Sequence, residues 1–153
     1  MLAKKIIRRA AGPSPAIRWV RFLPAVLWMA VIFTLSSRGG DELGTWLPYV
    51  NRIIPGLAGF DPMHYAAYFV LALTIAYGLG DRLSSSWKGF LLNVAICVLY
   101  GISDEWHQSF VPGRSPDLAD IWRDAAGSAA GAGLALGIVF LRRRRRHAKN
   151  YSA

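Results

Sequence analysis

The residues in this sequence best suited to chemistry are one histidine and four carboxylates that stand beside long apolar runs. A histidine can act as a general base, and carboxylates crowded into a poorly solvated place acquire different affinities for the proton. Two groups whose pKa values differ in this way can serve as the acid and the base of one reaction. We therefore take five residues as candidate catalytic groups: His64, Asp104, Glu105, Asp120 and Asp124.

Four further polar residues are candidates for holding a ligand. Tyr68 follows His64 by four positions, so the two share one face of a helix. Arg114 follows the turn pair Pro112-Gly113, which places its guanidinium near the carboxylates. There it could grip an anionic head group or form a salt bridge that joins two helices. The complete binding set is Tyr68, Gln108, Arg114 and Asp117.

The acidic residues after this turn continue into a glycine-rich pattern at helical spacing. Asp117, Asp120, Asp124, Gly127 and Gly131 follow one another at intervals of three and four residues. Small residues at this spacing let helices pack closely in lipid. A helix beginning near Asp117 would therefore turn its carboxylates toward the other helices rather than toward lipid.

The elements that must position these groups are four runs without a charged residue. A spanning helix needs about 20 apolar residues, so runs of this length indicate membrane spans. We predict an all-α integral membrane bundle of four transmembrane helices. The runs are Phe22–Ser37, Pro62–Gly80, Gly89–Ser103 and Ala125–Leu141.

Charge is divided unequally between the segments that flank these runs. The two ends of the chain and the short connection after the second run hold fourteen basic residues and one acid, a net +13. The other two connections hold four basic residues and eight acids, a net −4. Because cytoplasmic flanks are rich in Lys and Arg, we expect a multi-pass protein of the bacterial cytoplasmic membrane with both termini cytoplasmic.

The connection between the first two runs, 39–61, contains many aliphatic and aromatic residues. We expect an interfacial helix here, with Trp46 and Tyr49 at the level of the head groups. The sequence divides into a basic cytoplasmic tail at 1–18, a four-helix membrane domain at 19–141 and a second basic tail at 142–153. Directly after a span, the run Arg142–Arg146 is typical of a topology anchor on anionic lipid, so we predict no nucleic-acid partner.

Composition excludes several other classes of protein. The single cysteine, Cys97, excludes an intrachain disulfide framework and any Cys-x-x-Cys metal site. A charged fraction of 18% is below the roughly 25% of average soluble proteins. The sequence also lacks the Gly-x-Ser-x-Gly and His-Glu-x-x-His signatures of known hydrolases.

The stretch from Asp104 to Arg114, of the form Asp-Glu-x-x-Gln-x-Phe-x-Pro-Gly-Arg, resembles the VanZ-like family. The acidic and glycine positions that follow it, His64-x-x-x-Tyr68 at the start of a span and Trp28 with Ser36-Ser37 in the first span also fit. The resemblance runs from about Trp28 to Leu141. One position departs from the family pattern, because Asp61 stands where a lysine is usual, three residues before the histidine.

The resemblance implies a small bacterial membrane protein of the cell envelope, in a family named for a protein linked to teicoplanin resistance. Together with the residues it favours a protein that binds a lipid head group, an envelope precursor or a glycopeptide, with membrane lipids as partners. The alternative is a membrane-interface enzyme that performs acid/base hydrolysis or group transfer on a lipid-linked envelope substrate. We expect no cofactor or metal, with a divalent cation bound by the acids as a further alternative. A homo-oligomer through the glycine-rich fourth helix is also expected.

Overall fold

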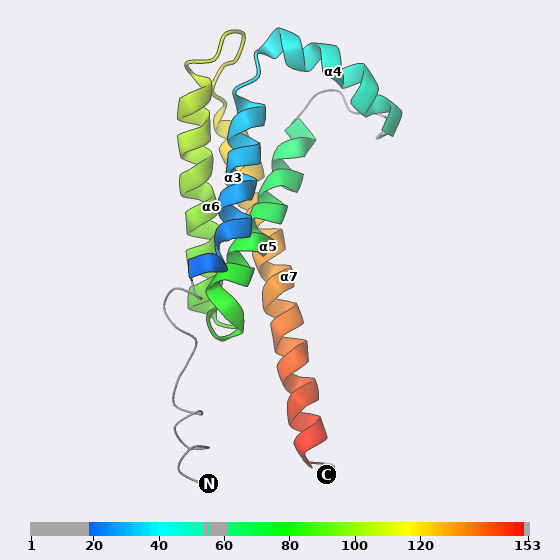
Figure 1. Ribbon diagram of the computed structural model, residues 1–153, viewed down its shortest axis with the longest axis vertical. Helices are drawn as coiled ribbons and strands as arrows, with labels where there is room; N and C mark the ends of the chain where they lie inside the picture. The colour runs from blue at the N-terminus through cyan, green and yellow to red at the C-terminus, as the bar shows by residue number, and fades with distance from the viewer. Residues whose placement is uncertain (1–18, 54, 56–60, 152–153) are drawn as a thin grey trace.

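The computed structural model describes residues 19–53, 55 and 61–151, and this part of the chain is helical without a β-strand. The basic segment 1–18 and several residues of the interfacial segment lie outside the described residues, as does the side chain of Asp61. In Figure 1 the helices run along one long axis, except for the cyan one, which lies across their upper end. The helices are α3 (Leu23–Ser36), α4 (Gly40–Ile53), α5 (Asp61–Ser84), α6 (Trp87–Gln108) and α7 (Leu118–Tyr151).

Three of these helices are long and apolar enough to cross a membrane, over Pro62–Asp81, Trp87–Gln108 and Leu118–Arg145. The helix α3 has 14 residues, or about 21 Å at 1.5 Å per residue, which is short of a hydrocarbon core of about 30 Å. Together with α4 it qualifies only as a bent pair, and the bend is 94°. The prediction of a helical membrane bundle is thus confirmed with three candidate spans, and a fourth depends on counting this bent pair as one.

Local sequence explains where the helices begin and end. The Ser86 side chain accepts a hydrogen bond from the Gly89 backbone N–H at 3.0 Å and so caps the start of α6. Between α6 and α7 the chain turns at Gly113, whose φ of +71° is a conformation that favours glycine. This turn contacts the start of α4, where the Gly40 N–H donates to the Pro112 carbonyl at 3.3 Å. We call this end of the bundle the α4 end.

The most extensive helix packing is between α5 and α7, and it uses the first glycine pair of α7. A Cβ at Gly127 would come within 2.4 Å of the Tyr65 carbonyl oxygen, and one at Gly131 within 2.4 Å of the Phe69 carbonyl oxygen. These two glycines therefore face α5, as the spacing predicted. A Cβ at Gly133 or Gly137, the later pair, would have no described atom of another segment within 4 Å. The predicted homo-oligomer contact on this helix stays a prediction. The buried core comprises Ala25, Ile32, Tyr68, Leu71, Ala72, Ile75, Cys97 and Ala132.

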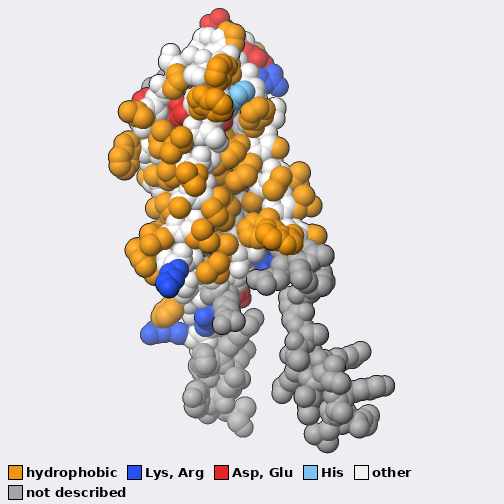
Figure 2. All heavy atoms as spheres, turned by 90° about the vertical axis from the view of Figure 1, so that its left-hand side faces the viewer, with side chains coloured by type: hydrophobic (Ala, Val, Ile, Leu, Met, Phe, Trp, Pro, Cys, Tyr) orange, Lys and Arg blue, Asp and Glu red, His pale blue; other side chains and the backbone are white. Residues whose placement is uncertain are grey.

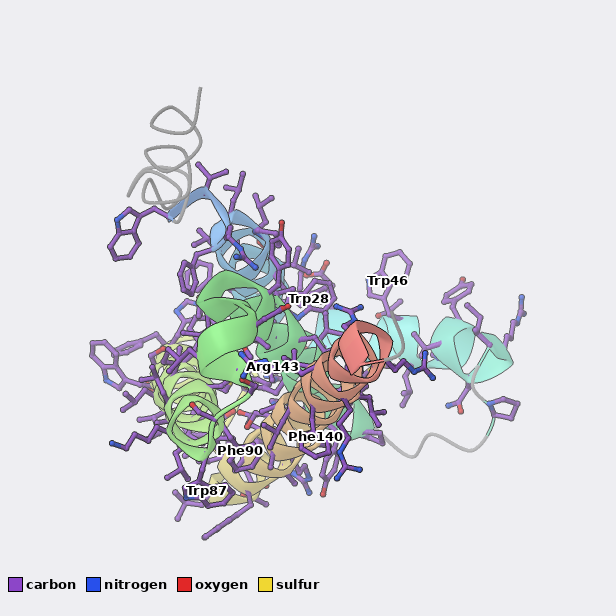
Figure 3. The ribbon with its side chains drawn as sticks, turned by 90° about the horizontal axis from the view of Figure 1, so that it is seen from below. Trp28, Trp46, Trp87, Phe90, Phe140 and Arg143 are labelled. Carbon is purple, nitrogen blue, oxygen red and sulfur yellow. The ribbon has the colours of Figure 1, made fainter. Side chains whose placement is uncertain are left out.

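The two ends of the bundle differ in their side chains. On the face shown in Figure 2, hydrophobic side chains cover the middle, and acidic and histidine side chains appear mainly toward the α4 end. Seen from below in Figure 3, Arg143 lies beside the end of α5, where its guanidinium donates to the Asp81 carbonyl at 2.9 Å. The basic run Arg142–Arg146 belongs to α7, which continues as a helix to Tyr151 rather than ending at the membrane domain.

Candidate functional site

The candidate residues converge at the α4 end, on four different helices. Helix α3 contributes one serine, α5 contributes His64 and Tyr68, and the rest come from α6 and α7. The acids Asp104, Glu105 and Asp124 are all buried, with exposed fractions of 3%, 4% and 0%. We call the set the polar cluster: Ser36, His64, Tyr68, Asp104, Glu105, Gln108, Asp120 and Asp124.

His64 lies between two carboxylates of α7. Its Nδ1 is 3.0 Å from Oδ1 of Asp124, and its Nε2 is 3.7 Å from Oδ2 of Asp120. The two acids are four residues apart and so occupy successive turns of one helical face. A carboxylate on one ring nitrogen fixes the orientation of the imidazole and makes the other nitrogen available for a proton or a metal ion.

Gln108 connects the acids of α6 to the turn that follows. Its Nε2 donates to Oδ2 of Asp104 and to Oε1 of Glu105, each at 3.1 Å. Its Oε1 accepts from the Arg114 guanidinium, with the Nε contact at 3.0 Å. The expected pairing of Arg114 with a carboxylate is replaced by this amide contact, because the amide satisfies the acids with its N–H and the arginine with its oxygen. Arg114 is therefore half-buried and held within the protein.

A hydrogen bond from a backbone N–H to a carboxylate connects the segment before α7 to α6. The Asp117 N–H donates to Oε2 of Glu105 at 2.8 Å, just before α7 begins. The Asp117 side chain is exposed and accepts from the Ala119 N–H at 2.8 Å, which caps the first turn of that helix. Arg123, which we did not select from the sequence, pairs with Asp120 one turn earlier. The three-residue spacing of this pair was the signal available for finding it.

Three oxygen atoms of the cluster have no hydrogen-bond partner among the described residues: the Tyr68 hydroxyl, Oδ1 of Asp104 and Oδ2 of Asp124. All three are buried, and a buried polar atom without a partner costs about 1–3 kcal/mol. The other oxygen of Asp104 accepts from the Ser36 hydroxyl at 2.8 Å. The interior of the α4 end therefore retains unused acceptors beside its acids, which suits a donor or a cation.

A groove of about 420 Å³ opens between α3 and α6 beside Asp104. His107 lies in it, 3.0 Å from the Ser37 hydroxyl, with its ring stacked on Phe33 at 4.3 Å between centroids. Two of the aromatic walls, Trp106 and Phe110, are 70% and 71% exposed. Sequence reasoning did not find this groove, because its two walls come from helices about 70 residues apart. It is lined by Phe33, Tyr100, Ser103, Asp104, Trp106, His107 and Phe110.

The polar cluster also contains a set of potential metal ligands. One ligand atom from each of His64, Glu105 and Asp120 can be chosen so that all three lie within 4.8 Å of one another. These residues come from α5, α6 and α7, so the three candidate spans meet here.

A family model described as VanZ/LLP1 matches residues 22–141, a range that includes every residue of the polar cluster and the groove. The chain belongs to the VanZ/LLP1 family. This match confirms the resemblance drawn from the Asp104–Arg114 stretch. No curated protein and no solved structure matches the chain significantly. As a VanZ/LLP1 member with three long apolar helices, the chain is a VanZ-like membrane protein.

Proposed function

We propose that this VanZ-like protein binds an amphiphilic molecule of the bacterial cell envelope, with the apolar part in the groove and the polar head at Asp104. Three candidates share this chemistry: a lipid, an envelope precursor and a glycopeptide such as teicoplanin. The protein would sit in the cytoplasmic membrane with both termini cytoplasmic and the α4 end outside. Binding there would lower susceptibility to teicoplanin if the drug is the ligand.

The observation that carries this proposal is the combination of an aromatic groove with a buried acceptor at its side. Oδ1 of Asp104 receives no hydrogen bond from the described residues, although Asp104 is 97% buried. A head group that donates a hydrogen bond, such as an amine, a hydroxyl or an amide, would satisfy this oxygen. Aromatic side chains are the usual walls for the apolar part of such a ligand.

Arg114 has a different part in this proposal from the one expected from sequence. Its guanidinium is engaged by Gln108, whose amide in turn holds Asp104 and Glu105. It therefore acts on the acids through Gln108 and is not among the residues that line the groove. Tyr68 and Asp117 likewise lie outside the lining, so we assign the head group to Asp104, Ser103 and His107.

The proposal is tested by susceptibility to teicoplanin and vancomycin in a sensitive Gram-positive host. Trp106→Ala removes a groove wall, while Trp122→Ala removes a similarly exposed tryptophan on α7 that is not in the lining. At matched membrane levels, we expect wild type and Trp122→Ala to shift teicoplanin tolerance, and Trp106→Ala and Asp104→Asn to lose that shift. Equal tolerance in all strains would exclude a glycopeptide ligand.

The lipid and precursor candidates are tested on the purified proteins. Mass spectrometry of co-purified amphiphiles compares Trp106→Ala with Trp122→Ala. Loss of one species from Trp106→Ala alone supports the groove as its site. Identical species in both variants and wild type, together with unchanged drug tolerance, would contradict the proposal.

A second candidate function is acid/base catalysis on a lipid-linked envelope substrate, and the His64–Asp124 contact favours it. Asp124 is fully buried and holds one nitrogen of the imidazole, which is how a general base is oriented. The two functions differ in their response to Asp124→Asn. Binding in the groove would persist in this variant, whereas turnover of a lipid-linked substrate would fall.

A further inference from the structure

We propose that His64, Glu105 and Asp120 form a binding site for a divalent transition-metal cation of the Zn²⁺ or Mn²⁺ type. The site is separate from the groove, because Glu105 follows Asp104 by one residue and so points roughly 100° away from it around α6. The proposal does not depend on amphiphile binding, and its test uses the cation alone.

The spacing of the donor atoms suits such an ion. In a tetrahedral site with metal–ligand bonds near 2.1 Å, neighbouring donors lie about 3.4 Å apart. Nε2 of His64 is 3.7 Å from Oδ2 of Asp120. One ligand atom from each of His64, Glu105 and Asp120 lies within 4.8 Å of the other two. Small side-chain shifts would bring all three onto one ion.

The bonds already made by these residues leave the required atoms available. Asp120 uses Oδ1 for Arg123, so its Oδ2 is the oxygen that faces His64. Each oxygen of Glu105 accepts one hydrogen bond, from Gln108 and from the Asp117 N–H, and each keeps a second lone pair for a metal. Arg114, which could have competed for the acids, donates to the Gln108 oxygen.

A further observation, independent of the three ligands, is that the carboxylate of Asp124 contacts His64. Oδ1 of Asp124 lies 3.0 Å from Nδ1 of His64, the arrangement that metal-binding histidines commonly show on the nitrogen away from the metal. Asp124 is fully buried, and its Oδ2 has no donor among the described residues. One of the two oxygens of this carboxylate therefore receives no hydrogen bond from the described residues.

The excess of acidic side chains in the cluster also favours binding of a cation. Four acids, Asp104, Glu105, Asp120 and Asp124, meet here, and Asp120 forms an ion pair with Arg123. Burying several carboxylates is costly unless positive charge accompanies them. One imidazole and two carboxylates match the ligand preferences of Zn²⁺ and Mn²⁺ better than those of Ca²⁺ or Cu⁺.

The test is direct metal binding by the full chain, purified in detergent through a histidine-free tag and stripped with a chelator. Calorimetric titration with Zn²⁺ and with Mn²⁺ measures affinity and stoichiometry. We expect one ion per chain, at least a tenfold loss of affinity in His64→Ala and in Asp120→Asn, and about a 10–100-fold loss in Asp124→Asn. The matched control is His107→Ala, which removes the groove histidine and should bind as wild type does.

Two further measurements guard against variants that fail to fold. Binding should raise the unfolding temperature of wild type and His107→Ala, because an ion that binds the folded state stabilises it. Co²⁺ bound to wild type should show the visible absorption of a low-symmetry site, which requires no variant. Absence of binding by wild type, or an equal loss in His107→Ala and His64→Ala, would overturn the proposal. Binding limited to Mg²⁺ or Ca²⁺ and unaffected by His64→Ala would overturn it as well.

Discussion

The backbone of Gly101 on α6 lies against the carboxylate of Asp124 on α7, so closely that a Cβ at position 101 would be 2.6 Å from Oδ2. A methyl group at position 101 would therefore require the Asp124 carboxylate or α6 to shift. The contact also explains how Asp124 can be fully buried and still reach His64, because α6 leaves room for the acid at this one position.

We expect Gly101→Ala to destabilise the protein by about 1–3 kcal/mol, as overpacking of a filled interior usually does. The cost arises from the contact with Asp124, so it should shrink when Gly101→Ala is introduced into Asp124→Ala. A double-mutant cycle of unfolding in detergent measures this coupling. Equal costs in both backgrounds would show that the contact is not the cause.

Helix packing predicts that alanine substitutions at two glycines of α7 change the stability of the protein differently. Gly127→Ala should weaken the bundle by about 1–3 kcal/mol, because its methyl group would strike the Tyr65 carbonyl of α5. Gly137→Ala has open space around it and should be neutral or stabilise the helix by up to about 1 kcal/mol. Unfolding temperatures of the two variants in one detergent make the comparison. A destabilised Gly137→Ala would instead indicate a contact between copies of the chain.

Because the amide of Gln108 bridges three charged side chains, replacing it by a side chain of similar size should lower the stability of the fold. Gln108→Met keeps the volume but removes the donor to Asp104 and Glu105 and the acceptor for Arg114. Hydrogen bonds to charged groups contribute about 1.5–3 kcal/mol each, so we expect a loss of at least that size. Chemical unfolding of the variant measures it. Thr45→Val on α4 is the control, because the Thr45 hydroxyl donates to the Asp41 carbonyl of the same helix. Equal stability of the two variants would contradict the bridging role.

Membrane topology is predicted by the charge division and by the helix directions. Reporter fusions after Arg146 and within the 81–88 connection should report the cytoplasm, and fusions within 39–61 should report the outside. The start of α3, the α5–α6 connection and the end of α7 lie at one end of the bundle, which agrees with this pattern (Figure 1). The reverse pattern would place the polar cluster on the cytoplasmic side and remove the proposed envelope ligands.

Several features of this protein followed from sequence because they depend on neighbours along one helix. The uncharged runs predicted the three helices long enough to cross a membrane, and the spacing of Gly127 and Gly131 predicted the face that packs on another helix. The Asp104–Arg114 stretch likewise indicated the family. Helical periodicity is local, so a residue's face can be assigned without knowing what lies opposite.

Tertiary structure decided which groups meet across helices. His64 lies between Asp124 and Asp120, and Arg114 donates to the amide oxygen of Gln108, because these contacts depend on the axial offset and rotation between helices. Close packing at the glycines of α7 sets that offset for α5. The 94° bend after α3 is also a feature of the tertiary structure, and α4 begins there against the 112–113 turn. The aromatic groove has the same origin, since its walls meet only when α3 and α6 lie side by side.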